Sequence, residues 1–540
     1  MRFQFTSEGD DDPPESLSRV NLNIMRIGIN FGTTRVVAAL VDRGNFPLVS
    51  FEAPDGQLHD WFPPVVAVNG DARIYGWEAI AVQENANWTV QRSLKRYLRS
   101  AGPQTKVPLA GQMLPLRLLM AEMMAALRTQ LLEHSNLGPT SPDEPEQKLD
   151  IMLGVPASAN SNQRFLTEEA AQAAGFTVLG LLNEPSAAAI EFAHRNSSER
   201  KSRIGSGLVV YDLGGGTFDV FLVTMGETEH TVEASDGIPG LGGDDFDEIL
   251  ASLALESLPH APNLTPAERY RLLEECREKK ESLNPNTRKI TIDLERVRAG
   301  WEQVTIPADD YYERCRPLIE QTRAVVENLL AAHPDRSLDT LYVTGGAAEL
   351  PPVARILRES FGRKVRRSSY MRSASAIGLA IRAAGHADSP QGPSADKLHD
   401  QFNRNFGLWR EADHGGTILF DLIFPRGVRL PAPGEQPLCV ERLYQPAHNI
   451  GHFRYLESSQ LNDQGQPTDE IANWYQIQFP FDAQLRHHPN LASVPIAQLA
   501  NPGNLRIREE YTCDSTGSLK VKITATPAGY TREYSIAQSA

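Results

Sequence analysis

The feature that most constrains this chain is a glycine-rich turn between two apolar strands. Residues 208–210 and 220–223 are apolar runs typical of buried strands, and the segment between them includes DLGGGTFD. Three successive glycines allow positive φ and a close approach to a ligand, so their N–H groups can converge on an anion. Asp212 and Asp219 flank the turn with carboxylates, which suit Mg²⁺ and its waters. The segment predicts a phosphate-binding hairpin; a glycine-rich hairpin with two solvated aspartates is the alternative.

A second unit of the same kind lies near the start of the chain. Residues 24–29 and 36–41 are predicted strands, and the turn between them contains NFGTT. The hydroxyl groups of Thr33 and Thr34 and the backbone of Gly32 are the expected phosphate donors. Two such turns that face each other across a cleft would hold a polyphosphate from both sides.

Strands alternate with helices around these units. Residues 151–155 and 178–182 are predicted strands, while residues 160–174 and a segment beginning at Asn183 are predicted helices. This order favours an α/β domain with mixed sheets. The apolar helix predicted at 114–132 is interrupted by charged residues, so we expect it to pack in a core and not to span a membrane.

The pattern changes after Gly385. Residues 386–397 are rich in Pro, Gly and Ser, which is typical of a flexible linker. From residue 406 to residue 536, short alternating strands are separated by turn residues, and this pattern predicts an antiparallel β-sandwich. The predicted parts are an acidic disordered tail at 1–23, an α/β domain at 24–384, a linker at 385–405 and an all-β domain at 406–540.

Length and charge exclude several classes of protein. A chain of 540 residues is long for one core, so two or more domains are expected. The net charge of −15 argues against nucleic acid and acidic membranes as partners. The first 23 residues contain no apolar core, so they do not resemble a signal peptide, and a cytoplasmic protein is expected. The four cysteines have no CxxC spacing, which argues against a zinc site.

Six motifs in order resemble the seventy-kilodalton heat-shock chaperone family. They are IGINFGTT, VPASANSNQR, NEPSAAAIEFA, YDLGGGTFDV, LGGDDFD and VTGGAAELP, and they cover residues 25–384. The resemblance implies an actin-like ATPase domain with two lobes and MgATP at the base of the cleft between them. A sugar kinase on the same superfold is less favoured, because LGGDDFD and NEPSAAA match the chaperone branch.

The resemblance also implies a role for individual residues. Lys95 would contact the γ-phosphate region, Glu184 would position the attacking water, and Asp219 would help to orient it. Asp212 would hold Mg²⁺ through water, as would Asn30. The other residues implied at the site are Thr217, counted with the catalytic set, and the nucleotide-binding residues Gly32, Thr33, Thr34, Gly214, Gly215, Gly216, Gly243, Lys280, Glu281, Asn284, Gly345 and Gly346. From the residues alone, a solvated helix lysine is the favoured interpretation of Lys95, and Glu184 could be a carboxylate that the helix dipole favours at a helix N-terminus.

Four residues depart from the pattern of the family. Asn30 stands where the family has aspartate, and an amide carries no charge to hold hydrated Mg²⁺. Glu281 and Glu349 occupy positions where the family has arginines beside the adenine, and Asn284 replaces a small hydroxyl residue. Carboxylates cannot stack on a base as guanidinium groups do, so weaker base binding is expected unless other contacts replace the two arginines. Slow hydrolysis is expected because Asn30 weakens the hold on hydrated Mg²⁺.

The C-terminal part resembles the peptide-binding β-domain of the same family. The resemblance rests on FPRGVRLP and REEYTCDSTGSLKVKITA, and an unrelated β-module is the alternative. The helical lid and the leucine-rich linker of the family are missing from the sequence, so fast peptide release and uncertain coupling between the domains are expected.

The predicted fold is thus an α/β actin-like two-lobed ATPase domain followed by an all-β sandwich-like domain. The predicted function is an ATP-dependent chaperone that hydrolyses ATP slowly to ADP with Mg²⁺ and binds extended segments of unfolded proteins. Co-chaperones are further partners that the resemblance implies. The alternative is a catalytically weak scaffold that senses nucleotide, in which Asn30 marks the loss of catalysis.

Overall fold

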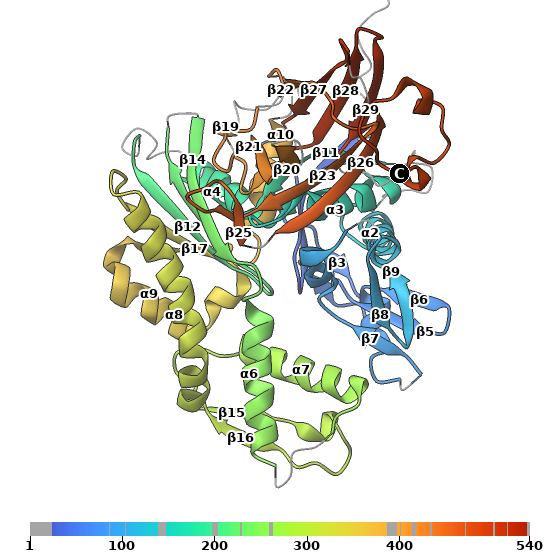
Figure 1. Cartoon of the computed structure of the whole chain (residues 1–540). Helices are drawn as coiled ribbons and strands as arrows, with labels where there is room; N and C mark the ends of the chain where they lie inside the picture. The colour runs from blue at the N-terminus through green and yellow to red at the C-terminus, as the bar shows by residue number, and fades with distance from the viewer. Residues whose placement is uncertain are drawn as a thin grey trace, which may run out of the picture.

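The computed structural model shows two lobes that face each other, with a body of β-sheets above them (Figure 1). It describes residues 24–536 except 86, 103, 139–146, 197–203, 227–228, 259–262, 386–396, 400, 413–416, 432–434, 470, 500–502 and 516. The predicted tail at 1–23 and most of the predicted linker therefore lie outside the described residues. No helix within the described part of the chain is both long and apolar enough to cross a bilayer.

The first lobe is built on a four-stranded sheet in the order β11-β10-β1-β2. Strand β1 pairs parallel with β10 and antiparallel with β2. The sheet strands are β1 (Ile24–Phe31), β2 (Val36–Leu40), β10 (Lys148–Val155) and β11 (Thr177–Asn183), and the helices are α1 (Trp77–Ala81), α2 (Leu116–Glu133), α3 (Ser161–Ala173), α4 (Glu184–Arg195) and the 3₁₀ helix η1 (Leu94–Ser100). Smaller hairpins complete the lobe: β3 (Phe51–Glu52), β4 (Leu58–His59), β5 (Val66–Asn69), β6 (Ala72–Tyr75), β7 (Thr89–Gln91), β8 (Lys106–Leu109) and β9 (Gln112–Pro115).

The second lobe contains a six-stranded sheet in the order β18-β17-β12-β13-β14-β19. Its strands are β12 (Gly207–Leu213), β13 (Phe218–Thr224), β14 (Glu229–Ile238), β17 (Thr340–Thr344), β18 (Val365–Arg367) and β19 (Lys397–His399). The other elements are α6 (Gly243–Glu256), α7 (Pro266–Glu281), β15 (Lys289–Ile292), β16 (Val304–Pro307), α8 (Ala308–Ala332), α9 (Pro351–Phe361), α10 (Ala374–Ala384) and the 3₁₀ helices η3 (Leu294–Arg296), η4 (Gly346–Glu349) and η5 (Gly362–Lys364). The strands and helices predicted around both glycine turns are all present, with ends shifted by a few residues.

Helices α4 and α10 pack against each other between the two sheets. Residues of both helices and both sheets form one buried cluster, which includes Val37, Ala188, Val210 and Leu379. The helices approach so closely at Gly378 that a Cβ atom there would lie 1.8 Å from the carbonyl oxygen of Ala187. This contact therefore fixes the relative position of the two lobes behind the cleft.

The substitution Gly378→Ala should lower the free energy of unfolding by about 3 kcal/mol, at the upper end of the usual cost of overpacking. The added methyl group would meet backbone atoms of α4, which cannot rotate away as a side chain can. Thermal unfolding of the purified protein measures the change. Gly102→Ala is the matched control and should cost much less, because Gly102 has no positive φ and the nearest atom to an added Cβ is the side-chain nitrogen of Asn162 at 3.9 Å. Equal melting temperatures for the two variants would contradict the close approach of the helices.

The C-terminal part consists of two antiparallel four-stranded sheets in the orders β21-β20-β23-β26 and β22-β27-β28-β29. Both sheets contribute to one hydrophobic core, with Phe406 and Phe479 from the first and Tyr511 and Val521 from the second. The strands are β20 (Asn405–Ala412), β21 (Thr417–Phe424), β22 (Leu438–Tyr444), β23 (Ile450–Ser458), β24 (Gln460–Leu461), β25 (Pro467–Asp469), β26 (Ala472–Pro480), β27 (Arg506–Cys513), β28 (Leu519–Thr526) and β29 (Tyr530–Ser535), with the 3₁₀ helices η7 (Ala483–Leu485) and η8 (Leu491–Ser493).

The last part of the predicted linker is attached to the lobes, contrary to the expectation of a flexible connection at 385–405. Strand β19 pairs parallel with β14 of the second lobe. The side-chain amide of Asn403 then donates to the carbonyl of Ala157 in the first lobe at 2.7 Å, and the hydroxyl of Ser235 in the second lobe donates to Asn403 at 3.0 Å. Strand pairing uses backbone groups, so this attachment requires no leucine side chains.

Candidate functional site

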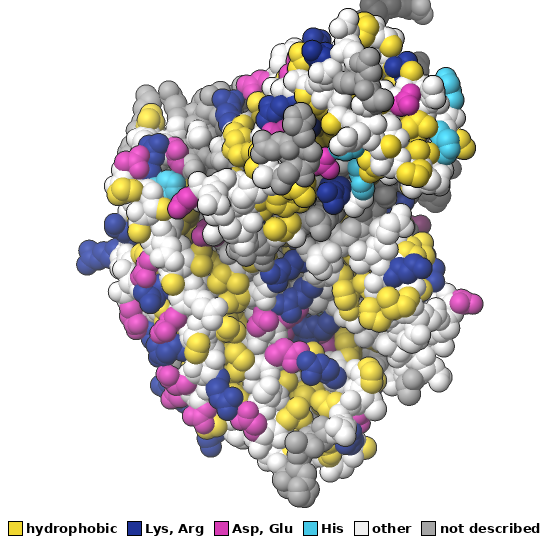
Figure 2. Space-filling view, in the orientation of Figure 1, with side chains coloured by type: hydrophobic (Ala, Val, Ile, Leu, Met, Phe, Trp, Pro, Cys, Tyr) yellow, Lys and Arg dark blue, Asp and Glu magenta, His cyan; other side chains and the backbone are white. Residues whose placement is uncertain are grey.

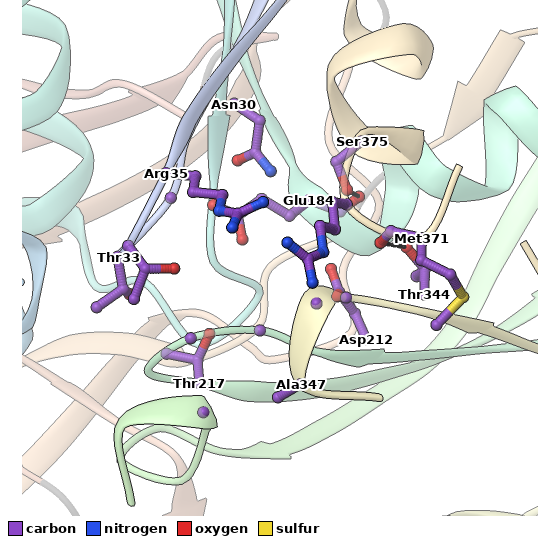
Figure 3. Close-up of a pocket in the computed structure, with 18 of the residues that line it drawn as sticks. Asn30, Thr33, Arg35, Glu184, Asp212, Thr217, Thr344, Ala347, Met371 and Ser375 are labelled. Atoms are coloured by element: carbon purple, nitrogen blue, oxygen red, sulfur yellow. Dashed lines mark hydrogen bonds between the residues drawn. The ribbon is translucent and has the colours of Figure 1, made fainter. Parts of the chain in front are cut away.

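The two predicted phosphate turns face each other across the cleft. A Cβ atom on Gly215 would lie 2.8 Å from the hydroxyl oxygen of Thr34, and one on Gly216 would lie 2.8 Å from that of Thr33. Only glycine can occupy these two positions while the turns remain this close. Thr33 and Thr217 come from opposite turns, and Glu184 and Asp212 extend into the space between them (Figure 3).

A cavity of about 100 Å³ lies between the turns. Its lining comprises Asn30, Gly32, Thr33, Thr34, Arg35, Lys95, Glu184, Asp212, Gly214, Gly215, Thr217, Gly243, Arg277, Lys280, Glu281, Thr344, Gly345, Gly346, Ala347, Met371, Arg372, Ala374 and Ser375. We refer to it as the front pocket. It brings together most of the predicted site residues from both lobes.

The inner end of the front pocket is rich in carboxylates. Lys95 on η1 is buried, and its ammonium group binds Glu184 Oε1 at 2.5 Å, so this lysine is not solvated. Burial, together with the charges of Glu184 and Asp219, raises the pKa of Asp212 well above its usual value. Burial and then Glu184 raise the pKa of Asp219 to about 7. Three carboxylates with one lysine form an electrostatic environment that favours an additional cation.

The residues fit a hydrated Mg²⁺ ion. The side-chain oxygens Asn30 Oδ1 and Asp219 Oδ1 are buried and accept no hydrogen bond from the part of the chain described here. Acceptors of this kind suit the waters of a magnesium ion, which keeps several of them and takes one or two carboxylates with substrate phosphates. No group of three His, Cys, Asp or Glu side chains converges on one point among the described residues, so direct ligation by a full set of protein groups is not indicated.

The outer end of the front pocket is formed by α7 and by the turn after β17. Lys280 is buried, and its ammonium group donates to the carbonyl of Gly243 at 2.7 Å and pairs with Asp247 at 2.7 Å. Gly345 has φ of +89°, and a Cβ atom there would lie 2.3 Å from the carbonyl of Leu213. The turn at Gly345 therefore brings the backbone itself to the surface of the pocket.

Arginines that the sequence analysis did not select also line the outer end. Arg372 binds Glu281 at 3.0 Å and Glu349 at 2.6 Å, and Arg35 from the first lobe also pairs with Glu281. Glu281 and Glu349, at the outer end where the resemblance implies the adenine base, are therefore neutralised by guanidinium groups from other elements. Arg372 and Arg35 are candidates for the replacing contacts that the sequence analysis left open. Two acids in a binding cleft require cationic partners, and that requirement was the only sequence signal for these arginines.

Three predicted residues lie outside the lining of the front pocket. Gly216 lies in the second turn against Thr33, and Asp219 lies opposite Asp212 in the β12–β13 register. Asn284 is exposed, and its side chain accepts a hydrogen bond from the N–H of Asn286. Helix α7 ends at Glu281, so the chain has turned away from the cleft before it reaches Asn284.

Comparisons with known proteins show which family the sequence resembles. Residues 144–392 match the family model described as Hsp70 protein. The chain is 30% identical over 442 residues to a chaperone protein HscA homolog of Methylobacillus flagellatus, covering 79% of this chain and 67% of the relative. It is 27% identical to a chaperone protein DnaK of Thermotoga petrophila, covering 75% of this chain and 66% of the relative. An HscA homolog of Herminiimonas arsenicoxydans is 27% identical over 537 residues, covering 95% and 78%.

The chain spans about two thirds of the length of the first two of these relatives. The third alignment extends into the C-terminal sheets, since it covers 95% of the chain. The similarity therefore includes both lobes and is not limited to a single motif.

Proposed function

Because the chain belongs to the Hsp70 family and has its actin-like two-lobed fold, we propose that it binds MgATP between its lobes and hydrolyses it slowly to ADP and phosphate. One observation carries the proposal. Two glycine–threonine turns from different lobes face each other across a single pocket that also contains Lys95, Glu184 and Asp212. Backbone N–H groups and hydroxyls of this kind bind phosphate oxygens, whereas the carboxylates order cation and water.

The proposed roles follow from the position of each side chain. The N–H groups of the two turns and the hydroxyls of Thr33, Thr34 and Thr217 bind the phosphates. Glu184 accepts a hydrogen bond from the attacking water, and Lys95 neutralises charge beside it. Asp212 and Asn30 would hold Mg²⁺ through its waters, and the ion would offset the negative charge of the phosphates.

The outer residues are assigned to the nucleoside. Lys280 and the turn at Gly345 and Gly346 would contact the ribose and the adenosine, and Arg372 offers a guanidinium plane at the base end. Arg372 is held by two acids, so its position is fixed before a base arrives. In this arrangement, Arg372 would contact the base in place of the two arginines that the family has at positions 281 and 349.

The C-terminal sheets are assigned to extended peptide segments of unfolded proteins. They carry a cavity of about 480 Å³. Its apolar lining includes Leu408, Trp409, Ile418, Leu443, Tyr444, Ile450, Phe453, Phe481 and Ile496. Three of these side chains remain more than half exposed, Ile418 and Leu443 at 58% and Ile496 at 51%. Exposed apolar residues around a cavity favour binding of apolar peptide side chains. We propose domain limits of 24–384 and 406–540, with co-chaperones as further partners.

A second candidate is a nucleotide-sensing scaffold with little catalysis. The uncharged Asn30 at the inner end of the pocket favours it, because an amide holds hydrated Mg²⁺ less strongly than a carboxylate. This candidate keeps the nucleotide site and the peptide-binding role and differs only in turnover.

Titration of ATP binding, combined with single-turnover hydrolysis of MgATP, tests the proposal. The substitution Asn30→Asp adds the missing charge and should raise single-turnover hydrolysis about tenfold if the rest of the machinery is intact. Asn45→Asp, in an exposed turn of the same lobe, adds the same charge away from the pocket and should have no effect.

Each outcome separates the candidates. Binding with hydrolysis that rises in the Asn30→Asp variant supports a slow ATPase. Binding without hydrolysis in either protein favours the scaffold. No binding of ATP would overturn the proposed nucleotide site.

A further inference from the structure

Arg92 joins the two lobes through a cluster of ion pairs. It lies in the first lobe, between β7 and η1, and only 12% of its side chain is exposed. Its guanidinium group binds three carboxylates of the second lobe, Glu274 at 2.7 Å and both Asp244 and Asp247 at 2.9 Å. Asp244 and Asp247 lie on α6 and Glu274 lies on α7, so one side chain holds two helices of the other lobe. In the space-filling view, basic and acidic side chains lie side by side where the lobes face each other (Figure 2).

Ser93 reinforces this contact from an uncommon backbone conformation. Its φ of +59° lies in the left-handed region, which residues other than glycine adopt infrequently. Its side chain is buried, and the hydroxyl donates to Asp244 Oδ2 at 2.7 Å, while Arg92 binds Oδ1 of the same carboxylate. An uncommon conformation that specific contacts hold in place points to a function for this segment.

The same short segment carries Lys95. This lysine lies three positions after Arg92, at the start of η1, and its ammonium group binds Glu184 in the front pocket. The two side chains therefore leave one segment toward different partners, Arg92 toward the second lobe and Lys95 into the pocket. A displacement of the segment would move Lys95 relative to the phosphates.

On the second lobe, the acid that Arg92 and Ser93 bind is attached to the phosphate turn. The N–H of Asp244 donates to the carbonyl of Gly215 at 2.8 Å, and the N–H of residue 243 donates to that of residue 214 at 2.9 Å. A Cβ atom on Gly242 would lie 2.5 Å from the backbone nitrogen of Gly216. The start of α6 and the turn are therefore packed too closely to move separately.

We propose that Arg92 is a positioning residue for the proposed hydrolysis of ATP, which sets Lys95 of the first lobe against the phosphate turn of the second. The proposal rests on the proposed function, in which Lys95 neutralises charge beside the attacking water. The turn binds the phosphates, so the alignment of the lobes determines how far the ammonium group lies from the transferred phosphoryl group. Arg92 itself does not line the front pocket, and it acts through Lys95.

The three acids keep other partners when the guanidinium group of Arg92 is removed. Each retains one contact: Asp247 with Lys280 at 2.7 Å, Glu274 with Arg277 at 2.5 Å, and Asp244 with Ser93 at 2.7 Å. None of the three carboxylates is then left without a partner, so a variant at position 92 should still fold.

Single-turnover hydrolysis of MgATP by the full chain, with a parallel titration of ATP binding, tests the proposal. Arg92→Gln should slow hydrolysis about 10- to 100-fold, because a small displacement of a catalytic group is costly, and it should still bind ATP. Arg92→Lys keeps the charge but cannot hold three carboxylates at once, so its rate should be intermediate. Arg73→Gln is the matched control and should hydrolyse ATP at the wild-type rate. Arg73 binds both carboxylate oxygens of Glu122, at 2.7 and 2.8 Å, but both residues belong to the first lobe.

Combination with Lys95→Met separates positioning of Lys95 from a general loss of structure. If Arg92 acts through Lys95, the two substitutions together should slow hydrolysis about tenfold less than the product of their separate effects. Effects that multiply would show that Arg92 acts independently of Lys95, and they would overturn the proposal.

Thermal unfolding of each variant shows whether it is folded. If Arg92→Gln does not fold, Arg92→Lys carries the test, and a wild-type rate in that variant overturns the proposal. A wild-type rate in folded Arg92→Gln overturns the positioning role alone and leaves the proposed hydrolysis intact. Absence of hydrolysis in the wild-type protein overturns the proposed ATPase activity and the positioning role with it.

Discussion

Replacing Lys95 with methionine should reduce single-turnover hydrolysis of ATP by about 10²- to 10³-fold, the usual cost of removing one electrostatic group from a catalytic site. Lys95 is buried at the inner end of the front pocket, and its ammonium group lies 2.5 Å from Glu184. Without it, Glu184, Asp212 and Asp219 face the phosphates with no lysine between them. The attacking water and the phosphate charge would then lose the ammonium group at the inner end of the pocket.

Rapid-quench measurement of the chemical step, with a parallel titration of ATP binding, checks this result. Lys106→Met is the matched control, because Lys106 is an exposed lysine in a hairpin of the same lobe. The control should retain wild-type hydrolysis. A Lys95→Met variant that hydrolyses ATP as fast as the control would exclude the proposed role of Lys95 and leave its pairing with Glu184 as a structural contact.

The substitution Arg410→Met should lower the free energy of unfolding of the C-terminal sheets by about 3–5 kcal/mol, the cost of leaving a buried charge without its partner. Glu509 on β27 is fully buried, and Arg410 on β20 binds both of its carboxylate oxygens, at 2.5 and 3.1 Å. The pair therefore joins the two sheets through the core. The hydroxyl of Tyr511 still donates to Glu509 in the variant, but it carries no charge.

Hydrogen exchange of the amides in β20 and β27 measures the local loss of stability. Arg442→Met is the control, because Arg442 binds Asp421 at a more exposed position and its removal should cost less than about 1 kcal/mol. Adding Glu509→Leu to Arg410→Met removes both charges and should restore most of the stability. If Arg410→Met exchanges no faster than Arg442→Met, the ion pair does not hold the sheets together.

The two glycine turns could be predicted from the sequence because their signal is local. Apolar strands, turn glycines and neighbouring hydroxyl residues lie within a few positions of each other, and short-range geometry determines the hairpins that they form. The same holds for Glu184, which directly follows a buried strand and begins a helix. The family could be recognised for the same reason, since its motifs are short and ordered.

Other residues of the site could not be predicted, because contacts between distant parts of the chain bring them there. Arg35 and Glu281 are separated by 246 positions and meet only when the lobes face each other. Arg372 reaches the pocket from the turn before α10, where no pattern distinguishes it from a surface arginine. Asn284 was predicted at the nucleotide site from its position in the sequence. It lies outside the front pocket, because the chain turns away after the end of α7.

The sequence by itself determined the strands, the turns and the chemistry at the inner end of the cleft, because these depend on neighbouring residues and on residue type. Tertiary structure alone decided which charges neutralise Glu281 and Glu349 and how residues 397–399 attach to the second lobe. These features depend on side chains and backbone edges that approach one another through space. Their positions follow from the packing of α4 against α10 and from contacts of the C-terminal part with both lobes, such as those of Glu457 with Ser161 and of Arg426 with Ser235.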